Sequence, residues 1–164
     1  VMLACDYAAL WQRVLGESSA RASRLHGPSH WSRVERNGLY IAARTGANAD
    51  VIMLFALLHD SMRWTDGLDP EHGLRAAEYA RSLRPLLRGL AGADLERLYE
   101  ACRWHTARRH HEDVTIGACW DADRLDIGRV GITLDAAFLN TPPAIAIAES
   151  GDLSVLEALT TRSV

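Results

Sequence analysis

Apolar residues recur along the chain at intervals of three and four, and runs of β-branched residues are scarce. This spacing is typical of amphipathic helices, whose buried face repeats about every 3.6 residues. Proline, glycine and capping residues mark where such helices begin and end. The pattern predicts an all-α fold with six core helices, at about residues 6–15, 28–45, 49–62, 70–84, 94–105 and 115–128.

Weaker helical signals follow residue 130. Short helices are expected at about 135–139, 144–149 and 152–159, with Pro142 and Pro143 between the first two. The stretches 18–27 and 64–70 are polar and rich in turn-forming residues, so we expect loops there. A length of 164 residues is that of one ordinary domain. We therefore expect a single domain over 1–164, with a core at about 26–130 and a C-terminal extension at 131–164.

The segment 51–58 is apolar nearly all round and predicts a buried, central helix, which ends in the pair His59-Asp60. Two ionisable side chains at the end of a buried helix are costly unless they are paired or coordinated. Neighbouring residues on a helix point about 100° apart, so other helices must supply any further ligands. His30 and Asp123 stand at suitable positions on two other predicted helices. Imidazole and carboxylate ligands together suit Zn, Mn, Fe, Co or Ni, with Mg as a further option.

In the order His30, His59-Asp60 and Asp123, the chain resembles the HD-domain superfamily of metal-dependent phosphohydrolases, over about residues 26–130. The resemblance implies an HD-like bundle of about six helices, with these four residues as ligands of a divalent metal. One ion is the expectation. A second ion would use His72 and His105, whose placements look like those of the extra ligands in some members, with Asp60 bridging the two ions.

Asp121 and Asp126 are rivals of Asp123 for the distant aspartate. Asp123 and Asp126 share a helix face at a spacing of three, and Asp121 points away. The context Asp123-Arg124-Leu125 favours Asp123 as the ligand. Asp126 is then a candidate to orient a ligand histidine, and Asp121 is expected to be a solvated or capping carboxylate.

The remaining histidines, the cysteines and the tryptophans have simpler interpretations. Three histidines are expected at the surface: His26, His110 and His111. For His26, a position at the mouth of the cleft is the alternative. Two cysteines are expected to be small core residues: Cys102 and Cys119. Four tryptophans adjoin the candidate ligands in sequence: Trp31, Trp64, Trp104 and Trp120. Core packing is the expectation for these rings, and stacking on a ring-bearing substrate is the alternative.

The resemblance implies hydrolysis of a small phosphate ester, with a nucleotide as one candidate, by metal-activated water. Asp60 is also a candidate base for that water. Arg63 and Arg124 are the nearest candidates to contact the phosphate, because phosphoryl transfer needs cationic groups. Two alternatives stay open: an HD-type di-iron oxygenase, which would need His72 and His105 as ligands, and a non-catalytic, metal-containing binding or regulatory module.

The composition of the chain limits the classes of partner that we expect. All 18 basic residues are arginine and the net charge is −3, so no global basic field favours a nucleic-acid polymer as partner. No apolar run reaches the roughly 18–20 residues that span a bilayer, and no membrane partner is expected. The three cysteines have no CxxC spacing and the start of the chain lacks a basic leader pattern, which favours the cytoplasm. A small phosphorylated molecule is the expected partner, and a homo-oligomer stays open.

Overall fold

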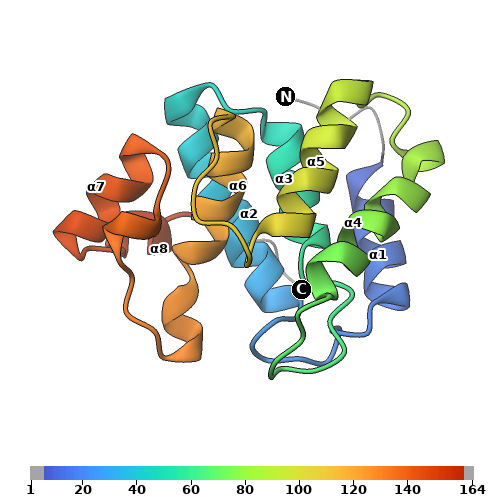
Figure 1. Cartoon of the computed structure of the whole chain (residues 1–164), viewed down its shortest axis with the longest axis horizontal. Coiled ribbons are helices and arrows are strands. Elements are labelled where there is room, and N and C mark those ends of the chain that lie inside the picture. Colours follow the sequence, from blue (N-terminus) through green and yellow to red (C-terminus); the bar gives the residue numbers. More distant parts are fainter. Residues whose placement is uncertain (1–5, 161–164) are drawn as a thin grey trace.

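The structure, a computed structural model, describes residues 6–160, and within that range all regular structure is helical (Figure 1). The core helices are α1 (Tyr7–Glu17), α2 (Pro28–Thr45), α3 (Ala49–Leu58), α4 (His72–Ser82), α5 (Gly92–Trp104) and α6 (Val114–Arg124). The shorter elements are the 3₁₀ turns η1 (Arg84–Leu86), η2 (Ile127–Val130) and η3 (Ala136–Phe138), with α7 (Pro142–Ser150) and α8 (Ser154–Glu157). The prediction of an all-α fold with six core helices and a short helical extension is confirmed.

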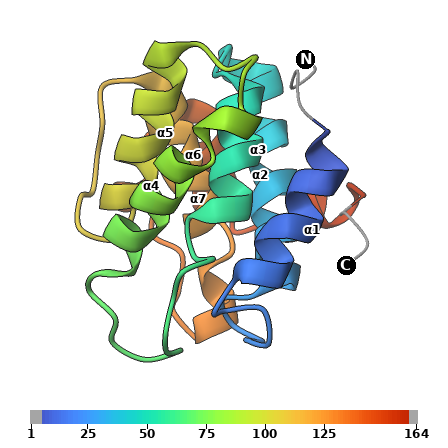
Figure 2. The same cartoon turned by 90° about the vertical axis from the view of Figure 1, so that its right-hand side faces the viewer.

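Helix α3 lies at the centre of the bundle. It contacts α2 and α6 on one side and α4 and α5 on the other, and it also touches α1 (Figures 1 and 2). Every side chain from Leu54 to Leu58 is fully buried, as the apolar run predicts. Between residues 6 and 160, no helix is both long enough and apolar enough to cross a bilayer.

Two glycines bring the helices that carry the candidate ligands close together. A Cβ atom at Gly38 of α2 would lie 2.2 Å from Cγ2 of Ile52 in α3. A Cβ atom at Gly73 of α4 would lie 2.7 Å from the carbonyl oxygen of Cys102 in α5. Because any larger residue would push these helices apart, glycine sets both crossings and thereby the spacing of the side chains beyond them.

Two helices end earlier than the sequence pattern predicts. Helix α3 ends at Leu58 rather than near residue 62, because Ser61 N–H donates to the Leu58 carbonyl at 3.0 Å and Arg63 N–H donates to the Asp60 carbonyl at 3.1 Å. These bonds reach back three residues and tighten the chain into a turn. Helix α6 ends at Arg124 and is followed by η2. Both ends carry candidate ligands, so these departures lie at the site.

The C-terminal extension is anchored on α6. Asp121 is fully buried and accepts hydrogen bonds from the backbone N–H groups of Asn140 and Thr141, at 2.9 and 2.7 Å. The expectation that Asp121 is solvated is therefore wrong, because its carboxylate holds the chain just before α7. The Arg124 guanidinium also holds the extension, since it donates to the carbonyl oxygen of Phe138 in η3.

Candidate metal centre

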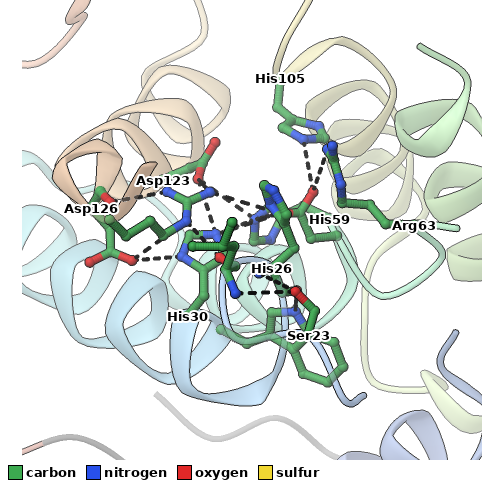
Figure 3. Close-up of polar contacts among 12 residues, drawn as sticks. Ser23, His26, His30, His59, Arg63, His105, Asp123 and Asp126 are labelled. Carbon is green, nitrogen blue, oxygen red and sulfur yellow. Dashed lines mark hydrogen bonds and ion pairs between the residues drawn. The ribbon is translucent and has the colours of Figure 1, made fainter. Parts of the chain in front are cut away.

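Four of the predicted ligands meet in one place, here called the His30 group: His30, His59, Asp60 and Asp123. The Nε2 atom of His30 lies 3.1 Å from Nε2 of His59 and 3.2 Å from Oδ1 of Asp123 (Figure 3). Oδ2 of Asp60 lies 3.6 Å from Nε2 of His59 and 3.7 Å from Nε2 of His30. His30, His59 and Asp60 are buried and their ligand atoms are close enough to hold one ion.

Asp60, His72 and His105 form a second set, here called the His72 group. The Nε2 atoms of His72 and His105 lie 3.0 Å apart. Oδ1 of Asp60 lies 3.3 Å from Nε2 of His72 and 3.6 Å from Nε2 of His105. These three residues are also buried and could hold one ion. Each oxygen of Asp60 thus faces one group, which is the arrangement expected of a carboxylate that bridges two ions.

The outer nitrogens of the histidine rings are already engaged. Nδ1 of His59, His72 and His105 lies within hydrogen-bond distance of the carbonyl oxygen three residues earlier in the chain. A carbonyl oxygen only accepts, so each Nδ1 carries a hydrogen, and Nε2 is the ring atom whose lone pair a metal can take. In His30, Nδ1 instead lies 2.7 Å from Oδ2 of Asp126, as the sequence analysis suggested for Asp126.

The donor set fits a divalent metal. Two pairs of Nε2 atoms face each other at 3.0 and 3.1 Å, and such lone pairs repel unless a proton or a cation lies against them. Two buried carboxylate oxygens, Oδ1 of Asp60 and Oδ1 of Asp123, receive no hydrogen bond. A buried anionic oxygen without a donor is costly. Neutral imidazoles and carboxylates that lack donors are the ligands that first-row transition metals prefer.

Electrostatics favour the metal-binding form of His59 and Asp60 and the protonated form of His30. Burial lowers the pKa of His59 to about 3, which leaves the imidazole neutral. Burial would raise the pKa of Asp60, but its contacts with His59 and with the other surrounding histidines hold that pKa well below its usual value. Burial would lower the pKa of His30, but its contacts with Asp123 and Asp126 outweigh burial and raise it. A metal would therefore displace a proton from His30.

His26 belongs to the centre, and the expectation that it is a surface residue is wrong. It is only 8% exposed, and its Nδ1 lies 2.9 Å from Oδ2 of Asp60 (Figure 3). The loop before α2 holds it there, because the His26 N–H donates to Oγ of Ser23 and the His26 carbonyl accepts from Nε1 of Trp31. The adjacent Gly27-Pro28, which starts α2, was the only sequence signal that placed His26 near His30.

Arg129, which the sequence analysis did not single out, also reaches the centre. Its Nε donates to the carbonyl oxygen of Leu25 at 2.8 Å and its Nη1 to the carbonyl oxygen of Asp126 at 3.1 Å. Its Nη2 lies 3.5 Å from Oδ1 of Asp123 and 3.9 Å from Oδ2 of Asp60. No spacing or motif distinguishes Arg129 from the other arginines of the chain, since its position depends on the turn η2.

The two predicted phosphate contacts lie in different surroundings. Arg63 is at the His72 group, with Nη1 3.1 Å from Nε2 of His72 and 3.7 Å from Oδ1 of Asp60. The guanidinium of Arg124 donates hydrogen bonds to the backbone carbonyl oxygens of four residues: His105, Arg108, Arg109 and Phe138. The structure therefore brings Arg63, but not the donors of Arg124, to the ligands.

The other singled-out residues are mostly packing residues. The core prediction is confirmed for four of them, which are fully buried: Trp31, Cys102, Cys119 and Trp120. Trp64 is instead 75% exposed, and the guanidinium of Arg75 lies over its ring at 3.8 Å, so the core expectation is wrong there. His110 is exposed as predicted, whereas His111 is half-buried against Trp120.

Comparisons with known proteins bear on the fold and on the candidate metal centre. No protein-family model and no curated protein matches the chain. Among solved structures, the chain is similar to a predicted HD superfamily hydrolase from an uncultured Thermotogales bacterium, with 28% sequence identity and a TM-score of 0.70. The match covers 92% of this chain and 87% of that chain. This likeness over nearly the whole bundle, together with the meeting of His30, His59-Asp60 and Asp123, confirms the resemblance of this chain to the HD superfamily.

Proposed function

We propose that this protein is a metal-dependent phosphohydrolase that cleaves a small phosphate ester with metal-activated water. The observation that supports this most directly is the convergence of four histidine Nε2 atoms on the two oxygens of Asp60. The similar solved protein, which is described as a predicted hydrolase, supports hydrolysis as the class of reaction. A divalent ion bound there would lower the pKa of a water molecule towards about 7 and polarise a phosphoryl oxygen.

Residues of this chain would orient the attacking water and bind the phosphate. Asp60 is ionised, and one of its oxygens is fixed by His26 at 2.9 Å, so it can hold the metal and orient the attacking water. Arg129 and Arg63 offer guanidinium groups from opposite sides of Asp60, at 3.9 and 3.7 Å. Two nitrogens of each guanidinium already donate to backbone carbonyl oxygens, so Nη2 of Arg129 and Nη1 of Arg63 are the groups that could donate a charged hydrogen bond to a phosphate oxygen. Arg124 is better suited to hold the extension, since its donors bind carbonyl oxygens.

A second candidate function is oxygen-dependent cleavage at a two-iron centre. The observation that favours it is the complete His72 group, which supplies ligands for a second ion. A binding or regulatory module without catalysis is the third reading, although such a role would not need every one of these ligands.

One experiment separates the three. Protein purified without added metal is analysed for metal identity and stoichiometry, and phosphate release from a panel of phosphate esters is measured with Mn, Fe, Zn, Co, Ni and Mg, in air and without oxygen. We expect phosphate release that persists without oxygen and is lost in Asp60→Ala. Substrate-dependent oxygen uptake at bound iron would instead support the oxygenase, and ligand binding without any turnover would support the module.

A further inference from the structure

A cavity of about 520 Å³ opens beside the metal centre. Its lining includes Asp123 of the His30 group and His105 of the His72 group, so it reaches one residue of each set of ligands. The opposite wall comes from the extension, between Ile132 and Phe138. The volume is in the range of pockets that hold a small organic molecule.

The wall that the extension contributes is mainly apolar. It includes the side chains of Ile132, Leu134 and Phe138, and Ile127 of η2 also lines the cavity. Ile132 is 55% exposed and Phe138 is 41% exposed, although both are large apolar residues. Exposed apolar side chains that gather around one cavity mark a binding surface rather than ordinary surface scatter. Arg124 is also in the lining, and both of its terminal nitrogens donate to carbonyl oxygens.

The rim of the cavity carries more arginines than carboxylates, since Asp135 lines it beside two arginines. Arg108 and Arg109 both belong to the lining, and the guanidinium of Arg109 lies 4.1 Å from the centre of the Phe138 ring. Arg108 pairs with Glu100 at 3.1 Å, whereas Arg109 has no ion pair with a carboxylate of residues 6–160. A cationic rim around an apolar interior favours a ligand with an anionic end and an apolar body.

We infer that this cavity receives the organic group of the substrate and selects phosphate monoesters of ring-bearing, largely apolar alcohols, with Phe138 as a residue that determines specificity. The inference rests on the proposed function, since it assumes a phosphate at the metal centre. Hydrolysis breaks the bond between phosphorus and the alcohol oxygen and forms a bond from the water oxygen to phosphorus. One hydrogen of the water is transferred to the oxygen of the alcohol, which leaves through the cavity. The phosphate then leaves the metal centre.

The test compares two esters of similar leaving-group pKa, ethyl phosphate and 2-(2-naphthyl)ethyl phosphate, with the metal-loaded protein. We expect kcat/KM to be about 10- to 100-fold higher for the naphthyl ester, because its ring system buries apolar surface in the cavity. Phe138→Ala is expected to reduce that preference about tenfold, while Phe138→Leu retains part of it. Leu86→Ala is the matched control, since Leu86 is 43% exposed but does not line this cavity.

Equilibrium dialysis of 2-(2-naphthyl)ethanol against the metal-free protein separates this inference from the proposed function. If neither ester is hydrolysed with any metal, but the alcohol binds to the wild type and to Leu86→Ala at least tenfold more tightly than to Phe138→Ala, the cavity assignment stands and the phosphohydrolase proposal fails. Equal kcat/KM for the two esters, or alcohol binding that is unaffected by Phe138→Ala in a protein with unchanged circular dichroism, overturns the cavity assignment.

Discussion

Nδ1 of His30 lies 2.7 Å from Oδ2 of Asp126, and this contact turns Nε2 of the same ring towards Asp123 and His59. The other oxygen of Asp126 accepts from Nε of Arg33 at 2.7 Å, which fixes the carboxylate. Burial would raise the pKa of Asp126, but the hydrogen bonds with His30 and Arg33 outweigh burial and lower it. An ionised acceptor on Nδ1 makes Nε2 a stronger metal ligand.

Asp126→Ala is therefore expected to weaken metal binding by about 10- to 100-fold without removing any direct ligand. The dissociation constant is measured by competition with a chelator of known affinity. Arg33→Gln is the control, because it removes the ion pair to Asp126 but leaves the acceptor for His30. Unchanged affinity in Asp126→Ala would show that the orientation of His30 does not depend on this carboxylate.

The two oxygens of Asp60 give a prediction about stoichiometry. Oδ2 faces His30 and His59, and Oδ1 faces His72 and His105. Asp60→Ala should therefore lower metal content at both groups, whereas His105→Ala should lower it only at the His72 group. Elemental analysis of each purified variant checks this. Loss of the same single equivalent in both variants would contradict a bridging role for Asp60.

The helices and the main ligands could be predicted because their signals are local. Apolar periodicity fixes which faces are buried, and the pair His59-Asp60 after an apolar run indicates a site without any knowledge of the loops. The order of His30 and Asp123 around that pair then supplied the remaining ligands. His72 and His105 carry no comparable local signal, because each is a single histidine at one end of a predicted helix.

The rest of the site depends on loops and turns, whose course the periodicity of a sequence does not encode. His26 faces Asp60 only because the stretch before α2 folds back, held by Oγ of Ser23. Arg129 reaches Asp123 only because α6 gives way to η2. Asp121 was expected at the surface, but the extension covers it and supplies its donors from Asn140 and Thr141.

Arg129 gives a prediction that separates phosphate binding from metal binding. Two carbonyl acceptors hold its guanidinium, and Nη2 is left near Asp123 and Asp60. Arg129→Gln is expected to lower kcat/KM for a phosphate ester by about 100-fold, the scale seen when one charge-stabilising donor is removed. Metal content should stay unchanged, as measured by elemental analysis. Loss of metal together with activity would assign Arg129 to the support of the ligands instead.

Asp113 gives a prediction about acid stability away from the centre. It caps α6, since its Oδ1 accepts from Thr115 N–H at 2.8 Å and from Ile116 N–H at 3.2 Å, and its Oδ2 accepts from Nε of Arg97 at 2.8 Å. Burial would raise the pKa of Asp113, but these hydrogen bonds lower it from 3.8. The folded-state pKa lies below the unfolded one, so the stabilisation is complete above about pH 4 and is lost as the pH falls through the folded-state pKa.

The free energy of unfolding, measured with urea from pH 7 downwards, should show this dependence. Asp113→Asn keeps a capping oxygen but no charge at the start of the helix, so it should be less stable than the wild type by about 0.5 kcal/mol at pH 7. That difference should shrink as the pH falls below about 4, where the wild-type carboxylate gains its proton. Asp113→Ala is the control, because without a cap it should remain the least stable of the three at every pH. A constant difference between Asp113→Asn and the wild type would mean that the charge of Asp113 does not stabilise the fold.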